Sequence, residues 1–153
     1  MQKSPKPDLP RRALFFLPLF ALAACGWRRD DTPAAGSAEV NRLIAVYSDR
    51  YGVPESLVHR VVRAESGYDP LARNGPYYGL MQLLPATAAT MGYRGEPVGL
   101  LDASTNLRYG VRYLRGAWIV GNRNADRAVM WYRKGYYYEA KRRGLLEETG
   151  LRG

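Results

Sequence analysis

The amino-acid sequence predicts a mainly α-helical domain, and three observations support this prediction. After residue 38, apolar residues recur every three to four positions, which is the spacing of one helix face. Glycine or proline stands between these periodic segments, where helices end and begin. No segment shows the sustained apolar and polar alternation that a long strand requires, although a short hairpin within Ala72–Tyr78 or Tyr93–Val98 remains open.

Two helices are predicted in the first part of this domain. The first starts its apolar face at Val40 and stops near Gly52. Pro54 follows, where the first position of a second helix tolerates proline. The apolar face of the second helix extends to Glu65, and Gly67 then acts as a helix stop. The sequence therefore places a carboxyl group at the end of an apolar helix face.

Three further helices are predicted in the second part. One covers Gly79 to Met91, with a break near Pro85. The next runs from Ala103 to Val120, and Gly110 within it allows a neighbouring element to approach closely. The last runs from Ala125 to Arg143.

The first 24 residues are typical of an export signal. Basic residues precede an uninterrupted apolar stretch, Ala13–Ala24, which is shorter than the roughly 20 residues that cross a membrane as a helix. The only cysteine, Cys25, follows small residues at the end of this stretch, as in bacterial lipoproteins. An ordinary secretory signal with a chance cysteine is the alternative. We expect residues 1–24 to be removed, Cys25 to carry lipid, residues 25–37 to form a tether, and residues 38–148 to fold.

The chain is basic, with 23 Lys and Arg against 14 Asp and Glu and a net charge of +9. Residues 1–24 hold four basic residues and one acidic residue, so the rest of the chain keeps a charge of +6. Such a charge favours nucleic acid, an anionic membrane or an acidic polymer such as peptidoglycan. Because the export signal argues against nucleic acid, we expect the partners to be a membrane and an acidic polymer. We also expect the protein to be a monomer.

Glu65 is the first candidate for chemistry. Burial at the end of an apolar helix face disfavours the charged form of a carboxyl group, and a carboxyl group that keeps its proton can act as a general acid. On periodicity alone, an exposed helix-terminal residue without chemistry is the alternative. His59 is the only histidine and has no second ligand at metal-binding spacing, so we expect no metal and no cofactor.

Three blocks of sequence add to this candidate. They are residues 64–70 (AESGYDP), 79–88 (GLMQLLPATA) and 101–114 (LDASTNLRYGVRYL). Together they resemble the soluble lytic transglycosylases of the goose-type lysozyme superfamily, in that family's order and over about residues 40–143. The resemblance implies a lysozyme-like helical fold with a sugar cleft and a peptidoglycan substrate.

The resemblance also implies roles for individual residues. In that family the first block carries the catalytic glutamate, so Glu65 is expected to be the catalytic acid and base. The second block lines the cleft, and a tyrosine on the last helix lies beside the catalytic glutamate. The residues expected to bind substrate are Ser66, Gly79, Met81, Gln82 and Tyr132.

The last helix departs from the family pattern at one position. Residues 131–135 (WYRKG) stand where the family usually shows A-Y-N-x-G, so Tyr132 and Gly135 match and Arg133 replaces the asparagine. The asparagine's role in the cleft is therefore not carried over. The Arg133 side chain faces either the cleft, where its planar donor fork suits carboxylates, or solvent. We expect the cleft.

The resemblance implies a reaction that uses one carboxyl group, where most glycosidases use two. Glu65 would protonate the oxygen between N-acetylmuramic acid and N-acetylglucosamine, and then take the proton of the C6 hydroxyl as a 1,6-anhydro sugar closes. The enzyme would act in the periplasm, anchored through Cys25 to the outer membrane. A hydrolytic lysozyme and a non-catalytic peptidoglycan-binding or assembly module on the same fold are the alternatives.

Overall fold

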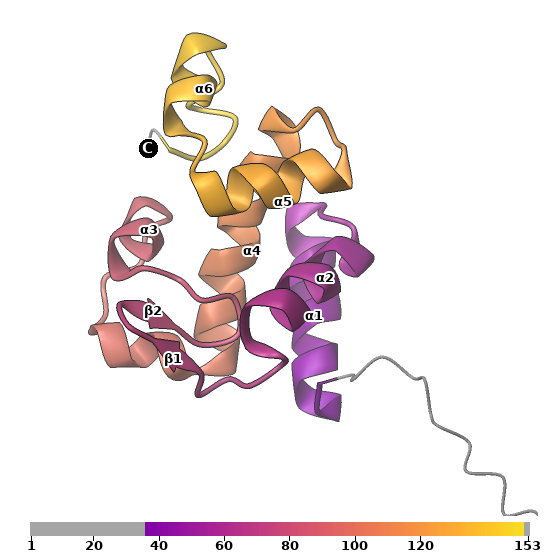
Figure 1. Ribbon diagram of the computed structural model, residues 1–153, viewed down its shortest axis with the longest axis vertical. Coiled ribbons are helices and arrows are strands. Elements are labelled where there is room, and N and C mark those ends of the chain that lie inside the picture. Colours follow the sequence, from indigo (N-terminus) through magenta and orange to yellow (C-terminus); the bar gives the residue numbers. More distant parts are fainter. Residues whose placement is uncertain (1–35, 152–153) are drawn as a thin grey trace, which may run out of the picture. The chain divides into compact units, whose positions relative to one another are not determined.

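The structure, a computed structural model, describes residues 36–151. The predicted signal peptide, Cys25 and all but the end of the predicted tether lie outside these residues. The described part is mainly α-helical, as predicted, and contains one short hairpin (Figure 1). No helix in it is long and apolar enough to cross a membrane. The elements are α1 (Ala38–Tyr51), α2 (Glu55–Ser66), β1 (Arg73–Asn74), β2 (Tyr77–Tyr78), α3 (Pro85–Thr90), the 3-10 helix η1 (Pro97–Leu101), α4 (Ala103–Val120), α5 (Ala125–Lys134) and α6 (Tyr137–Arg142).

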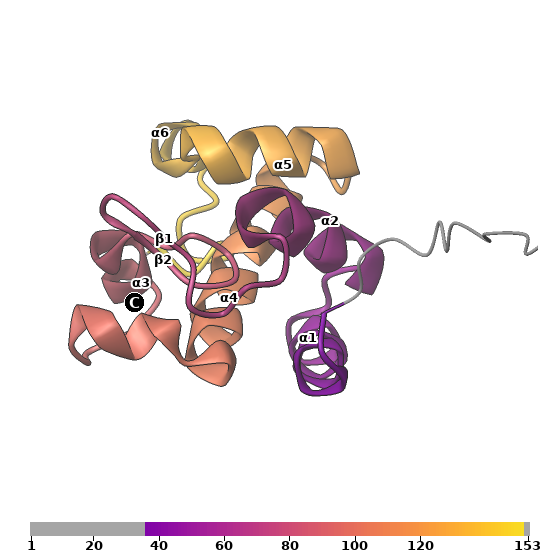
Figure 2. The same ribbon diagram turned by 60° about the horizontal axis from the view of Figure 1, so that its bottom comes forward.

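Helix α4 lies at the centre of this domain, and α1, α3, α5 and η1 pack against it (Figures 1 and 2). Its first turn is capped by Asp102, whose carboxylate accepts a hydrogen bond of 2.7 Å from the backbone N–H of Thr105. Its predicted bounds are confirmed. Three apolar residues of its inward face are fully buried: Leu107, Val111 and Leu114.

The first two helices end where the sequence predicts. Gly52 and Gly67 have φ angles of 62° and 59°, which is the left-handed conformation that glycine adopts readily at a helix end. Pro54 lies just before α2, one position earlier than predicted. Because α2 ends at Ser66, Glu65 lies in its last turn.

The predicted helix from Gly79 to Met91 is wrong in its first half. Gly79 and Gln82 have φ angles of 68° and 46°, and a right-handed helix cannot contain such residues. Residues 79–82 therefore form turns, Leu83 pairs with Tyr78 in an isolated β-bridge, and α3 begins only at Pro85, in the first position of the helix.

The predicted helix from Ala125 to Arg143 is wrong in its length, because the helix ends at Lys134. Gly135 has φ and ψ angles of 82° and 140°, and α6 begins two residues later. Tyr136 lies at this break with only 1% of its surface exposed, and its hydroxyl donates a hydrogen bond of 2.9 Å to the carbonyl oxygen of Tyr113 in α4. This buried tyrosine anchors the break between α5 and α6 against α4.

Of the two segments in which the sequence left a hairpin open, Ala72–Tyr78 forms one. Strands β1 and β2 pair antiparallel, with Arg73 opposite Tyr78. The second candidate hairpin, Tyr93–Val98, does not form, and η1 begins at Pro97 instead. The hairpin projects beside the end of α2, where it forms one rim of the site described next (Figure 1).

Candidate active site

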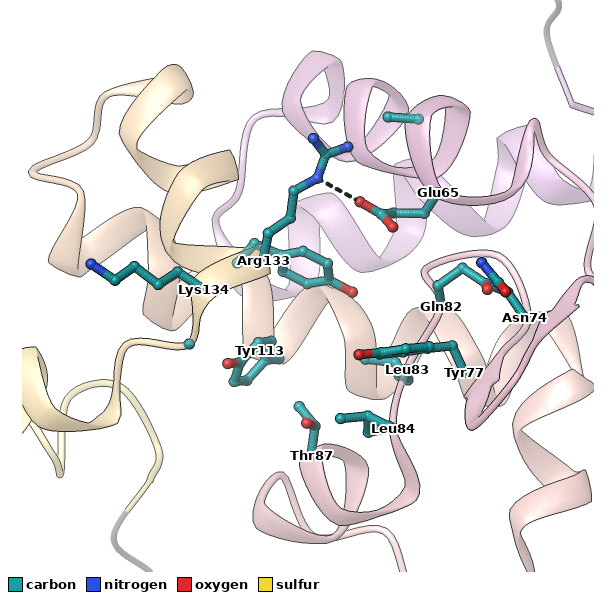
Figure 3. A pocket seen from close by; sticks show the side chains of 13 residues that line it. Glu65, Asn74, Tyr77, Gln82, Leu83, Leu84, Thr87, Tyr113, Arg133 and Lys134 are labelled. Carbon is teal, nitrogen blue, oxygen red and sulfur yellow. Dashed lines mark hydrogen bonds and ion pairs between the residues drawn. The ribbon is translucent and has the colours of Figure 1, made fainter.

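A cavity of about 520 Å³ lies between the end of α2, the hairpin, α3, α4 and the end of α5 (Figure 3). Its volume falls within the range of about 300–1,000 Å³ that is common for small-molecule sites. The lining residues are Ala64, Glu65, Asn74 and Tyr77 from α2 and the hairpin, Gln82, Leu83, Leu84 and Thr87 from the following turn and α3, and Tyr113, Tyr132, Arg133, Lys134 and Gly135 from α4, α5 and the residue after it.

Glu65 supplies the only carboxyl group among these lining residues. It reaches the cavity because α2 ends immediately afterwards, at Gly67, so its side chain is not covered by a further helical turn. The side chain is 20% exposed, and Figure 3 shows it directed into the space between α2 and α5. The site can therefore supply one proton donor and acceptor of the carboxyl type.

The turn that carries Gln82 is held in place by Asn106, a fully buried residue in the first turn of α4. Its side-chain oxygen accepts a hydrogen bond from the backbone N–H of Met81, and its amide nitrogen donates to the carbonyl oxygens of Tyr78 and Leu100, each at 2.8 Å. A β-carbon at Gly79 would lie 2.5 Å from the same amide nitrogen, so only glycine fits there. These contacts fix the backbone that leads to Gln82.

Ser66 ties the same turn to α2. Its hydroxyl lies 2.8 Å from the carbonyl oxygen of Leu80, to which it donates a hydrogen bond. Of the residues predicted to bind substrate, Ser66, Gly79 and Met81 are therefore absent from the cavity lining, because their polar groups or backbones are engaged within the protein. They shape the turn that presents Gln82 to the cavity.

Gln82 lies on the cavity wall, as predicted for a residue that contacts substrate. Its side-chain nitrogen donates hydrogen bonds to the carbonyl oxygens of Ala72 (3.2 Å) and Gly79 (3.0 Å). These bonds fix the orientation of the amide group. Its carbonyl oxygen has no hydrogen-bond partner among the described residues, so it is a ready acceptor for an N–H or O–H group of a ligand.

Tyr132 lines the cavity from α5 and is almost completely buried. Its hydroxyl donates a hydrogen bond of 2.7 Å to the carbonyl oxygen of Met81. The pKa of Tyr132 is raised well above its usual value, first by burial and second by the negative charge of the neighbouring Glu65. The hydroxyl therefore keeps its proton, and Tyr132 links α5 to the turn that carries Gln82.

Arg133 faces the cavity, as expected from the sequence. Its Nε lies 2.9 Å from Oε1 of Glu65 and donates a hydrogen bond to it (Figure 3). The Arg133 side chain is 54% exposed, so the ion pair is open to solvent on the arginine side. The neighbouring Lys134 points away from Glu65 and lies 5.5 Å from the ring of Trp131.

The structure adds residues to which the sequence assigned no role. Asn106 and Tyr113 are seven positions apart on α4 and so share one helix face, a spacing that was available as a signal. The ring of Tyr113 packs edge to face against Tyr132, with centroids 5.5 Å apart. Asn74 and Tyr77 reach the cavity only through the hairpin, which local sequence patterns do not orient.

Comparison with protein families gives a match over most of the folded part. Residues 42–144 match the family described as the transglycosylase SLT domain. The chain is 37% identical over 92 residues to a membrane-bound lytic murein transglycosylase C of Haemophilus influenzae, and 34% identical over 82 residues to a membrane-bound lytic murein transglycosylase E of Buchnera aphidicola. These matches cover 55% and 48% of this chain, but only 25% and 37% of the relatives.

The fold also matches a solved structure. The 70 kDa soluble lytic transglycosylase of Escherichia coli superposes with a TM-score of 0.59 and 26% sequence identity. The match covers 71% of this chain and 18% of the larger protein. The present chain thus corresponds to one part of that protein and to about a quarter of the Haemophilus relative.

Proposed function

The chain belongs to the transglycosylase SLT domain family, and from this premise we propose that it is a lytic transglycosylase of peptidoglycan. It cleaves the bond between N-acetylmuramic acid and N-acetylglucosamine. The observation that carries the proposal is the single carboxyl group, Glu65, in a cavity that also holds Gln82 and Tyr132. The two relatives named as lytic murein transglycosylases support the substrate class.

In the first step Glu65 gives its proton to the glycosidic oxygen. The bond from this oxygen to C1 of the muramoyl sugar breaks, and its electron pair stays with the oxygen of the leaving N-acetylglucosamine. The carbonyl oxygen of the substrate's own N-acetyl group stabilises the cation at C1, a task that a second carboxylate performs in most glycosidases. The free acceptor of Gln82 suits an N–H or hydroxyl group of the bound sugar.

In the second step Glu65, now a carboxylate, accepts the proton of the C6 hydroxyl group on the same muramoyl sugar. The C6 oxygen then bonds to C1 and closes a 1,6-anhydro ring. Glu65 recovers its proton, and no water is consumed. A fixed carboxyl position suits both proton transfers, and the bonds of Ser66 and Tyr132 hold the walls around Glu65.

A non-catalytic wall-binding module is the second candidate. The observation that favours it is the ion pair between Glu65 and Arg133, because a carboxylate engaged with a guanidinium is not a proton donor. The Arg133 side of this ion pair is 54% exposed, however, and solvent-screened pairs contribute about 0–1 kcal/mol, so substrate can displace Arg133 at little cost. The enzyme is therefore the preferred proposal.

Digestion of purified peptidoglycan tests the proposal. We expect soluble fragments whose muramoyl ends are one water lighter than reducing ends, as mass spectrometry resolves. Reducing muramic acid ends would identify a hydrolase instead. Binding to the insoluble wall without any released fragment would identify a non-catalytic module.

The proposed location is the periplasmic face of the outer membrane, with the domain held by lipid on Cys25. The lipoprotein-like sequence around Cys25 and the membrane-bound names of the relatives support this location. Replacing Cys25 by Ala and separating inner-membrane, outer-membrane and soluble fractions tests it. Unchanged recovery of the variant in the membrane fraction would contradict a lipid anchor at this residue.

A further inference from the structure

Arg133 uses only part of its hydrogen-bonding capacity in the empty site. Its Nε contacts Glu65, while its two terminal amino groups have no hydrogen-bond partner among the described residues. These groups together form the planar fork that binds a carboxylate through two parallel hydrogen bonds. The 54% exposure of the side chain leaves this fork accessible from the cavity mouth.

The charges around the cavity change when Glu65 takes up a proton. Its charged lining residues are Glu65, Arg133 and Lys134, so protonation of Glu65 removes the only negative charge and leaves two positive ones. A bound glycan displaces water from the cavity at the same time, and a desolvated cation without a partner is costly. The reactive state of the site therefore calls for an anion from the substrate.

Of the two cations, Arg133 is the one placed to bind this anion. It points toward Glu65 across the cavity, whereas Lys134 points away and lies near the ring of Trp131 (Figure 3). Its side chain is 54% exposed, so solvent screens its contact with Glu65 and the contact is weakly held. The long side chain can exchange Glu65 for another carboxylate without movement of α5.

We propose that Arg133 binds a carboxylate of the muramoyl unit beside the scissile bond and makes the enzyme selective for glycan strands that carry one. This inference rests on the proposed function and names the feature of the substrate that the site selects. The carboxylate has two chemical sources. It belongs either to the lactyl group of a peptide-free strand or to the stem peptide of an intact strand.

Binding to the Glu65→Gln variant tests the inference without catalysis. Glutamine resembles the protonated glutamic acid and leaves Arg133 without its charged partner. We expect Glu65→Gln to bind carboxylate-bearing strands about tenfold more tightly than Glu65→Gln/Arg133→Asn does, as expected for a charge-assisted hydrogen bond. Strands whose carboxylates are all amidated should bind equally to the two proteins.

Four ligands distinguish the sources of the carboxylate: peptide-bearing strands, peptide-free strands with free lactyl groups, and the amidated form of each. A loss confined to peptide-bearing strands assigns the stem peptide, and a loss on peptide-free strands assigns the lactyl group. An equal loss on amidated strands, or no loss on any, would overturn the inference. Arg127→Asn, an exposed position on the same helix, is the matched control for the lost charge and should change no affinity.

Steady-state kinetics then separates this inference from the proposed function. With Arg133→Asn we expect the ratio of kcat/KM on carboxylate-bearing strands to kcat/KM on amidated strands to fall about tenfold, mainly through KM on the carboxylate-bearing strands. Arg133→Lys should recover part of the loss, because it restores the charge without the fork. If wild-type protein cleaves no strand, the proposed function fails, while the binding experiment still decides the role of Arg133.

Discussion

The two sides of the cavity differ in how firmly their functional groups are held. On the fixed side, formed by Glu65, Gln82 and Tyr132, each residue is half-buried or buried, and internal hydrogen bonds hold Gln82, Tyr132 and the turn they contact. On the exposed side, formed by Arg133 and Lys134, the side chains are long and mostly in solvent. The fixed side suits chemistry that needs constant geometry, and the exposed side suits recognition of variable groups on a substrate.

Substitution of Glu65 by Gln should have the largest effect on activity. A positioned acid and base contributes about 10²–10⁴-fold to a rate, so we expect wall digestion to slow by roughly 10³-fold. The fall in turbidity of a wall suspension measures this rate. Glu55→Gln, in the first turn of the same helix, is the control and should digest normally. Normal digestion by Glu65→Gln would remove Glu65 from the mechanism.

Substitution of Asn106 by Ala should have the largest effect on stability, because Asn106 holds the turn on the fixed side. The change leaves the buried N–H of Met81 and the carbonyl oxygen of Leu100 without this partner, and each such group costs about 1–3 kcal/mol. The carbonyl oxygen of Tyr78 still accepts a hydrogen bond from the backbone N–H of Leu83. We expect the free energy of unfolding in urea to fall by about 3 kcal/mol. Thr105→Ala, one residue earlier, should change it by less than about 0.5 kcal/mol. Equal effects would mean that Asn106 does not hold this turn.

Substitution of Tyr132 by Phe should have a smaller effect on the same side. It removes the hydrogen bond to the carbonyl oxygen of Met81, which is worth about 1 kcal/mol of unfolding free energy. Digestion should also slow by about tenfold, because the wall beside Glu65 loses a tie to the turn. The exposed Tyr138 offers a control, since Tyr138→Phe removes a hydroxyl that is in solvent. A stable and fully active Tyr132→Phe would show that this side needs no such bond.

Substitution of Arg133 by Ala should have the smallest effect on stability, although it changes substrate choice. An exposed ion pair contributes about 0–1 kcal/mol, so we expect the free energy of unfolding to change by less than about 1 kcal/mol. A double-mutant cycle with Glu65→Gln measures the coupling between the two side chains directly. Coupling well above this range would place Arg133 on the fixed side and would abolish the distinction drawn between the two sides.

Local signals predicted the parts of the fold that depend on neighbouring residues. The helix stops at Gly52 and Gly67 and the bounds of α4 were predicted, because a glycine or a capping aspartate acts within one turn. The turn after Gly79 was taken for a helix, since the residue that shapes it, Asn106, lies 27 positions later in the chain. Contacts so distant in sequence leave no periodic signal.

The site shows the same division. Glu65 and Tyr132 could be nominated from resemblance to a family, and both lie on the cavity wall. Two other features depend on how α2 and α4 pack. Ser66 donates a hydrogen bond to a backbone carbonyl oxygen, and Tyr113 lines the cavity wall. Arg133 and Glu65 are 68 positions apart in sequence, so only the fold reveals the contact between them.

The central claim is that Glu65 serves as both acid and base while the substrate's own C6 hydroxyl group replaces water. Digestion of peptidoglycan in water enriched in oxygen-18, followed by mass spectrometry of the new muramoyl ends, tests it most directly. The account predicts that these ends contain no oxygen-18, because the oxygen newly bonded to C1 is the C6 oxygen of the same sugar. One oxygen-18 atom in each new end would show that water attacks C1, and would contradict the account.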